Sequence, residues 1–386
     1  MLSRLLQRIC WCSFLIFLLA CSREEAAMPQ MRTVAPIPAN PALTPEAREL
    51  FNRLGENYGK FTVAGQVDYQ EDGRFVTLDY IAKTVQRSPV MVGLDLIDYS
   101  PSRQAFGADP GTLIEDAIKM VKKDKLVLTL NWHWNAPMHL LNDDREPWWR
   151  AQYANGSEFN LRQAMRNPNS AEYRALLRDI DAIAVPLKRL AEENIPVLWR
   201  PLHAADGGWF WWGARGPEAF KELWRLMFAR LTGEHNLNNL IWVLTSEDAE
   251  WYPGDDVVDI IGLDAYPNDR MTLLEEEWTR LLKIHNGRKM IALTEFGGVP
   301  LIEEMQQAGV YFAYFVSWTD RNRGKLGPMN VAPEHLRKVY HSPAVITLDE
   351  WHETSNEQPA GGATPPEEPP ESQAEAGETL EDPTPL

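Results

Sequence analysis

Short apolar runs alternate with amphipathic segments of helical period along most of the chain. The helical segments include one whose apolar face runs from Tyr173 to Leu190, and one from Pro217 to a C-terminal cap at Gly233. Apolar runs separated by such helices indicate a parallel sheet that is covered on both faces. They predict eight strands, at residues 61–66, 89–95, 126–133, 196–203, 240–245, 257–264, 290–295 and 310–318.

Eight strand–helix units in one continuous body favour the α/β class and a closed (β/α)8 TIM barrel over an open sheet. A dinucleotide-binding fold is disfavoured, because no glycine-rich phosphate-binding sequence follows the first strand. The sequence therefore predicts one barrel domain, over residues 44–350.

The two ends of the chain depart from this pattern. Residues 1–21 carry Arg4 and Arg8 before an apolar run that is too short to span a bilayer, which is typical of an export signal. Residues 22–43 are polar and contain several prolines, as in a linker. Residues 351–386 are acidic and rich in proline, so a disordered tail is expected.

The signal ends in Leu19-Ala20-Cys21, which resembles a bacterial lipoprotein box. The resemblance implies cleavage before Cys21 and attachment of lipid to its thiol. Ser22 follows the cysteine, and in that pattern a residue other than aspartate favours the outer membrane of the bacterial cell envelope. The alternative is an ordinary signal peptide that contains a cysteine.

Composition narrows the chemistry of the body. The net charge of −17 argues against a nucleic-acid partner, although residues 355–386 alone hold eight acidic side chains and no basic one. All three cysteines, Cys10, Cys12 and Cys21, lie in the signal, which excludes a disulfide scaffold and a cysteine-ligated zinc site in the barrel. The 15 tryptophans suit either packing or stacking on sugar rings, and composition does not decide between the two.

Polar and aromatic residues close several of the predicted strands. In a TIM barrel these positions gather at one rim, where active sites lie. They are Gln66, Asp95, Trp132-His133-Trp134, Arg200, His203, Asp264, Tyr266, Glu295 and Trp318. Taken singly, each also fits a structural role, such as a helix cap or a satisfied core histidine. Together, the carboxylates, arginine, histidines and tryptophans suit glycoside hydrolysis.

Seven tryptophans fall at or beside strand ends, and we expect a sugar chain to lie along them, with some used in packing. They are Trp132, Trp134, Trp199, Trp209, Trp211, Trp212 and Trp318. Neither a metal nor a cofactor is expected, because the eight histidines are scattered without metal-ligand spacing. A serine hydrolase is disfavoured by the lack of a Gly-x-Ser-x-Gly turn.

The segment WRPLHAADGGWFWWG, residues 199–213, resembles the fourth-strand signature of glycoside hydrolase family 26, whose members are mostly β-mannanases. Further segments occur in the family's order over residues 45–345: VGLD, NWHWNAP, EPWW, GSEFNLRQAM, WYPGDDVVDIIGLDAYP and ALTEFGG. The resemblance implies a TIM barrel that cleaves β-1,4-mannan or manno-oligosaccharides by retaining double displacement, with no cofactor. A monomer is expected.

The same resemblance implies roles for individual residues. Glu295 matches the nucleophile, Tyr266 the aromatic hydroxyl close to it, and Asp264 a polar neighbour. His203 matches the histidine just before the acid/base residue. The positions that line the sugar subsites correspond to His133, Arg200, Trp209 and Trp318.

One position departs from the family. Its pattern is Arg-Pro-Leu-His-Glu, whereas this chain has Ala204 in place of the acid/base glutamate. A retaining glycosidase needs two carboxyl groups about 5–5.5 Å apart, and a methyl group transfers no proton. Asp206 is a poor substitute, because family members with the glutamate commonly carry Asp or Asn there too. The sequence therefore predicts severely impaired hydrolysis of mannan.

Three explanations for Ala204 stay open: an engineered knockout, a natural pseudoenzyme, or an acid supplied from elsewhere in the chain. The corresponding alternative function is a non-catalytic lipoprotein that binds glycans. A weaker alternative is a hydrolase of xylan or mixed-linkage glucan. The sequence does not distinguish endo from exo action.

Overall fold

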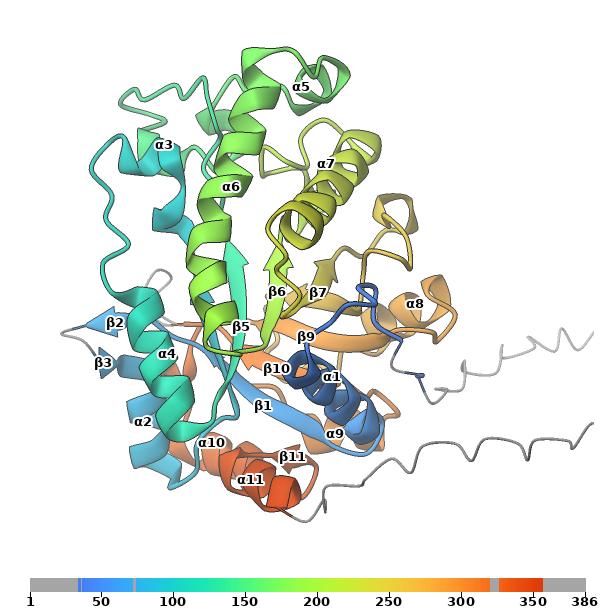
Figure 1. Ribbon diagram of the computed structural model, residues 1–386. Coiled ribbons are helices and arrows are strands. Elements are labelled where there is room, and N and C mark those ends of the chain that lie inside the picture. Colours follow the sequence, from blue (N-terminus) through green and yellow to red (C-terminus); the bar gives the residue numbers. More distant parts are fainter. Residues whose placement is uncertain (1–33, 36, 72–73, 320–325, 357–386) are drawn as a thin grey trace, which may run out of the picture.

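The computed structural model describes residues 34–35, 37–71, 74–319 and 326–356. All eight predicted strands are present and parallel, and the pairing of β1 (Thr62–Val67) with β10 (Tyr314–Ser317) closes them into a barrel (Figure 1). The predicted (β/α)8 TIM barrel is thus confirmed. In chain order, the barrel strands are β1 (Thr62–Val67), β4 (Met91–Asp95), β5 (Val127–Trp132), β6 (Val197–Pro201), β7 (Leu240–Thr245), β8 (Ile260–Ala265), β9 (Met290–Phe296) and β10 (Tyr314–Ser317).

Helices surround the barrel, and their buried faces follow the helical period seen in the sequence (Figure 1). In α6 (Ala171–Glu192), the side chain of Ser170 caps the first turn by accepting a hydrogen bond from the Tyr173 amide at 3.0 Å. The helices that follow barrel strands are α2 (Val76–Val85), α4 (Leu113–Asp124), α6 (Ala171–Glu192), α7 (Pro217–Ala229), α8 (Glu275–Ile284), α9 (Ile302–Gln307) and α10 (Pro333–Tyr340).

The prediction that α7 ends at a Gly233 cap is wrong. The α-helix ends at Ala229 and continues as a π-helical turn over Arg230–Glu234, with Gly233 inside it. A glycine caps a helix when it adopts the left-handed conformation, and here the left-handed residue is Asn236, at φ 54°.

Two helices that the strand pattern did not predict close the amino-terminal end of the barrel. Helix α1 (Pro45–Asn57) buries Leu50, Phe51 and Leu54 against apolar residues of the barrel interior. Helix α11 (Leu348–Asn356) follows the short strand β11 (Val345–Ile346), which pairs with β1. Besides short 3-10 turns, the described residues also form the hairpin of β2 (Gln70–Glu71) and β3 (Arg74–Phe75) and the short helices α3 (Pro101–Gln104) and α5 (Leu161–Arg166).

Described residues on both sides of the range 44–350 also pack against the barrel. Val34 and Leu43 are buried within the predicted linker, and the Ala39 amide donates to Asp259 at 2.6 Å. At the other end, α11 continues to Asn356 and buries Trp351. The predicted signal with its lipidation site Cys21, and nearly all of the predicted tail, lie outside the described residues. No described helix has the length and apolar character needed to cross a membrane.

Side-chain alternation along the strands explains why the barrel interior is apolar toward the amino-terminal ends of the strands and polar at their carboxyl ends. Leu198 and Ile260 point into the apolar lower layer, and two or four residues further along the same strands come Arg200 and Asp264. A β-bulge in the β8–β9 pair sets Asp264 opposite Glu295, so that Thr294 and Glu295 both reach the mouth of the barrel.

Candidate active site

Glu295 lies at the carboxyl end of β9 and is almost fully buried, with 4% of its surface exposed. One of its carboxylate oxygens accepts a hydrogen bond from the Arg200 guanidinium, and the other accepts one from the Tyr266 hydroxyl. Three strands thus deliver one carboxylate and two donors to the same point. Both oxygens are held in place, which suits a group that must attack in a fixed direction.

Arg200 forms a fork between two buried carboxylates. Its Nη1 donates to Asp264 at 2.8 Å, and its Nη2 donates to Glu295. Burial lowers the pKa of Arg200, but the charges of Asp264 and Glu295 outweigh burial and raise it above the ordinary value. The guanidinium therefore stays charged inside the barrel mouth.

Two neighbours of Glu295, Asp264 and Tyr266, have pKa values above their ordinary ones. Burial raises the pKa of Asp264 to about 7, against the opposing charge of Arg200. Burial at the hydroxyl end and the charge of Glu295 raise the pKa of Tyr266 well above its ordinary value. The Thr294 hydroxyl donates to the other oxygen of Asp264 at 2.7 Å. This contact requires glycine at 262, where a Cβ would lie 2.6 Å from the Thr294 oxygen.

A second polar chain links the ends of β4, β5 and β6. Asp95 Oδ2 lies 2.6 Å from His133 Nδ1, and His133 Nε2 lies 3.1 Å from His203 Nε2. Burial lowers the pKa of His133, but Asp95 and Glu295 outweigh burial and raise it. Burial and the charge of His133 lower the pKa of His203 well below its ordinary value. The geometry fits one proton shared by the two imidazoles.

Residue 204 contributes a methyl group and an unusual backbone. Ala204 has φ 48° and Leu202 has φ 53°, so two left-handed residues turn the chain sharply after β6. Such a conformation costs about 1–2 kcal/mol for a residue with a Cβ, and strained backbone of this kind is common at functional sites. Nearby, Asp206 Oδ2 accepts hydrogen bonds from the Ser246 hydroxyl at 3.1 Å and the Glu247 amide at 2.7 Å.

The seven strand-end tryptophans separate into two groups. The expected packing role belongs to Trp132, Trp134, Trp199, Trp211 and Trp212, which are fully buried. Four of their indole N–H groups bond to protein groups; that of Trp212 donates to the His203 carbonyl at 3.0 Å. Only Trp209, 52% exposed, and the half-buried Trp318 are accessible.

Trp209 has a rigid base. A Cβ at Gly207 would lie 1.8 Å from its indole ring, so the ring rests directly on the glycine. Gln66, predicted as a rim residue, instead fastens β1 to β10: its Nε2 donates to the carbonyls of Val67 at 2.8 Å and Trp318 at 3.0 Å. The rim therefore contains both site residues and structural ones.

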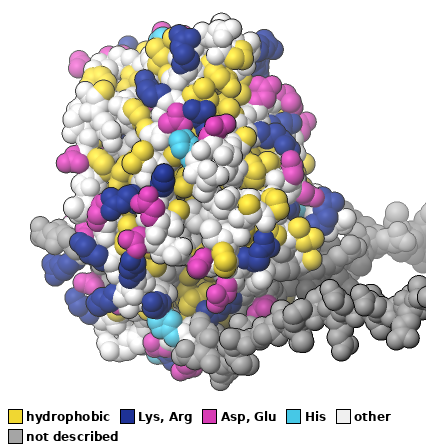
Figure 2. Space-filling view, viewed as in Figure 1, with side chains coloured by type: hydrophobic (Ala, Val, Ile, Leu, Met, Phe, Trp, Pro, Cys, Tyr) yellow, Lys and Arg dark blue, Asp and Glu magenta, His cyan; other side chains and the backbone are white. Residues whose placement is uncertain are grey.

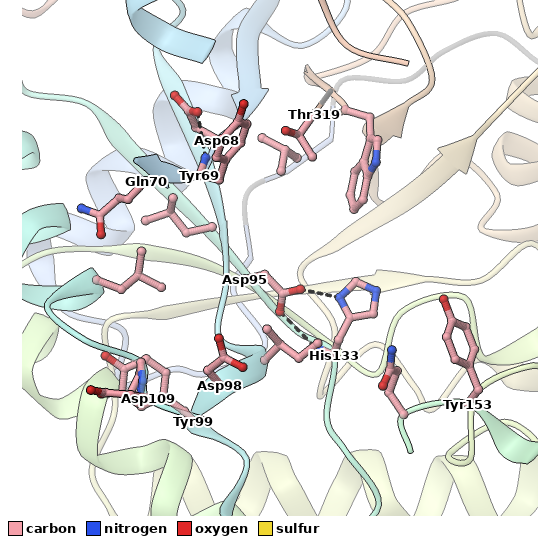
Figure 3. A pocket seen from close by; sticks show the side chains of 17 residues that line it. Asp68, Tyr69, Gln70, Asp95, Asp98, Tyr99, Asp109, His133, Tyr153 and Thr319 are labelled. Carbon is pink, nitrogen blue, oxygen red and sulfur yellow. Dashed lines mark hydrogen bonds and ion pairs between the residues drawn. The ribbon is translucent and has the colours of Figure 1, made fainter. Parts of the chain in front are cut away.

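A cavity of about 430 Å³ opens beside these groups, at the ends of β1, β4, β5 and β10. Figure 3 shows the Asp95–His133 pair in it, between Asp68 and Tyr69 on one side and Tyr153 on the other. Trp318 also lines it and packs edge-on against Tyr266, with ring centroids 5.8 Å apart. The cavity is therefore continuous with the residues around Glu295.

Sequence reasoning found most of this cluster but missed three contributors. It did not assign Thr294, although alternation along β9 places it inside the barrel next to Glu295. It identified Asp95 as a strand-end residue but not as the partner of His133. Gln152 carries no motif at all. Within the described residues, no group of acidic, histidine or cysteine side chains has the arrangement of a metal site.

On the visible face of the protein, charged side chains of the described residues do not gather into a patch of one sign (Figure 2). Acidic and basic side chains are interspersed there. The features that converge chemically are those at the carboxyl end of the barrel.

Comparison with known proteins identifies the family of the chain. The sequence profile described as glycosyl hydrolase family 26 matches residues 39–350. A mannan endo-1,4-beta-mannosidase of Thermothelomyces thermophilus is 42% identical over 313 residues, which cover 81% of this chain and 62% of the relative. Mannan endo-1,4-beta-mannosidase A of Piromyces sp is 31% identical, over 82% of this chain and 50% of the relative. The chain thus spans between half and two thirds of the length of these relatives.

Solved structures agree in fold. The Podospora anserina GH26-CBM35 beta-(1,4)-mannanase superposes with a TM-score of 0.77 at 38% identity, covering 83% of this chain and 70% of that one. A beta-mannanase from a symbiotic protist of the termite Reticulitermes speratus, complexed with gluco-manno-oligosaccharide, superposes with a TM-score of 0.73 at 31% identity. The match covers 83% of this chain and 99% of that one. The chain belongs to glycosyl hydrolase family 26.

Proposed function

We propose that the protein binds β-1,4-mannan or manno-oligosaccharides at the carboxyl end of the barrel, and that it is built as a retaining endo-β-mannanase with Glu295 as nucleophile. The names of its relatives support this substrate class. The observation that carries the proposal is the carboxylate of Glu295, fixed between the Arg200 guanidinium and the Tyr266 hydroxyl. No cofactor enters the scheme.

The reaction has two steps. A Glu295 oxygen attacks the anomeric carbon and forms a glycosyl ester while the bond to the departing sugar breaks, and that sugar's oxygen takes up a proton. Water then attacks the anomeric carbon of this ester and gives up a proton, and the Glu295 carboxylate is released. In relatives with a glutamate after the histidine, that side chain would exchange the proton; here the position is Ala204.

Without this group, mannan should be cleaved very slowly. General acid–base catalysis contributes about 10²–10⁴-fold, and the same residue would serve both steps. We expect binding to persist, because Arg200 contacts Glu295, His133 and Trp318 line the adjoining cavity, and the ring of Trp209 is exposed.

An activated substrate tests the assignment. An aryl mannobioside with an acidic phenol needs little proton donation, so we expect phenol release that exceeds cleavage of mannan and increases with added azide. Glu295→Gln is the control and should abolish both activities. Full activity on mannan without azide would show that another residue supplies the acid.

The alternative function is capture of glycans without cleavage, and the methyl group of Ala204 is the observation that favours it. Binding of mannan, xylan and mixed-linkage glucan, measured side by side, identifies the ligand class. A protein that binds mannan but releases no phenol from the aryl substrate is a binder whose nucleophile has lost its function.

We further propose a lipid anchor on Cys21 and a place in the bacterial outer membrane, from the sequence of residues 1–22. Mass spectrometry of the mature amino-terminal peptide should show a modified Cys21. In the Cys21→Ser variant, the protein should leave the membrane fraction. An unmodified peptide that begins elsewhere would contradict the anchor.

A further inference from the structure

Gln152 is a buried residue whose side-chain oxygen has no hydrogen-bond partner within the described part of the chain. It follows the 3-10 turn Trp148–Arg150 and lines the cavity beside His133, with 8% of its surface exposed. Its Oε1 is buried and has no hydrogen-bond partner among the described residues. The backbone here is fixed, because the Gln152 carbonyl accepts from the Trp211 amide at 3.1 Å.

A buried carbonyl oxygen without a donor is costly, since it has lost water and gained nothing in exchange. Leucine of similar size would fill the same space without this cost. Such unpaired groups are rare in folded proteins, and each calls for a specific reason. A ligand that supplies the missing donor is one such reason.

A second unpaired polar atom lines the same cavity. The indole N–H of Trp318 is buried and has no acceptor among the described residues. The cavity therefore presents an acceptor from Gln152 and a donor from Trp318. A sugar hydroxyl can donate one hydrogen bond and accept others, so adjacent hydroxyls on a pyranose can satisfy both.

The cavity also adjoins the reacting position. His133 lines it and is bonded to His203, next to Ala204. Trp318 lines it and packs against Tyr266, which donates to Glu295. A volume of about 430 Å³ lies within the usual range of small-molecule sites.

We propose that Gln152 is a specificity-determining residue, whose side-chain oxygen accepts a hydrogen bond from a hydroxyl of the sugar unit next to the one that reacts. The proposal rests on the proposed function, because it assumes a glycan in the cleft. Gln152 takes no part in bond breaking; it holds the neighbouring sugar in register.

The test is a pair of opposite effects in one variant. Gln152→Leu should weaken the affinity for manno-oligosaccharides that fill the cavity by about tenfold, measured by calorimetry over chain lengths of two to five units. The same variant should melt at the same temperature as the wild type or higher, because a buried unpaired group has been removed. Gln152→Glu keeps an acceptor and should retain most of the affinity.

Gln163→Leu is the matched control, since Gln163 is exposed and eleven residues away on α5; it should change neither property. Unchanged affinity in Gln152→Leu would overturn the proposal. So would a fall in melting temperature together with equal losses for all chain lengths, which would mark a structural role. If the wild type binds no manno-oligosaccharide, the proposed function fails instead.

Discussion

Arg200→Met removes the cation between two buried carboxylates and leaves the packing volume nearly unchanged. The side chains of Asp264 and Glu295 are only 8% and 5% exposed, so water cannot replace the lost charge. Removing one partner of a buried ion pair costs about 3–5 kcal/mol, because the other charge stays buried. We expect a loss of this size in the free energy of unfolding at neutral pH.

The loss in the free energy of unfolding of Arg200→Met should become smaller as the pH falls. Two carboxylates without a cation repel each other, which raises the pKa of one of them further. A carboxyl group with a raised pKa in the folded state gains stability from protonation, so the deficit should narrow as the pH is lowered from about 8 to about 5. Phenol release from the aryl mannobioside should fall, since Glu295 loses the guanidinium that holds one of its oxygens in place.

Urea denaturation across this pH range measures both effects. Arg225→Met is the control: Arg225 is half exposed and pairs with Asp256 at 2.7 Å, so its loss should cost less than about 1 kcal/mol. If Arg200→Met were no less stable than Arg225→Met and still released phenol at the wild-type rate, the assigned roles of Arg200 and Glu295 would be wrong.

Two further predictions concern the neighbouring groups. In Asp95→Asn, His133 loses the carboxylate that raises its pKa. A histidine whose pKa is raised in the folded state stabilises the fold at pH values below the ordinary pKa of 6.5, and this stabilisation is lost as the pH rises. Urea denaturation should therefore show the largest loss in the free energy of unfolding near about pH 5–6 and the smallest near about pH 8. A deficit independent of pH would contradict this. Trp212 is fully buried, so Trp212→Ala should lower the free energy of unfolding by about 3–5 kcal/mol. Trp209 is exposed, so Trp209→Ala should leave the melting temperature unchanged and weaken oligosaccharide binding. Equal melting temperatures of the two variants would refute the distinction.

The sequence predicted the barrel well because burial on both faces imposes continuous apolar strands. The same logic located Arg200, Asp264 and Glu295, since each ends such a run. The position of a residue along a strand does not show whether its side chain bonds to groups inside the protein or faces the cleft. Strand position alone therefore did not separate the five buried tryptophans, whose N–H groups are bonded inside the protein or enclosed by the core, from the two accessible ones.

Features that depend on contacts across long sequence distances could not be predicted. Helix α1 closes the barrel because its apolar face meets strand residues far along the chain. Asp95 and His133 are 38 residues apart, and only the register of β4 with β5 brings them together. The side-chain oxygen of Gln152 lacks a hydrogen-bond partner among the residues that the structure describes, and no local sequence pattern indicates this.

The most direct test of the central claim is Ala204→Glu. Both residues carry a Cβ, so the left-handed backbone at position 204 is no more strained after the exchange. If the site is complete apart from this group, hydrolysis of mannan should increase by about 10²–10⁴-fold, with release of phenol from the aryl substrate much less affected. A variant that folds and binds mannan but hydrolyses it as slowly as the original chain would contradict the account.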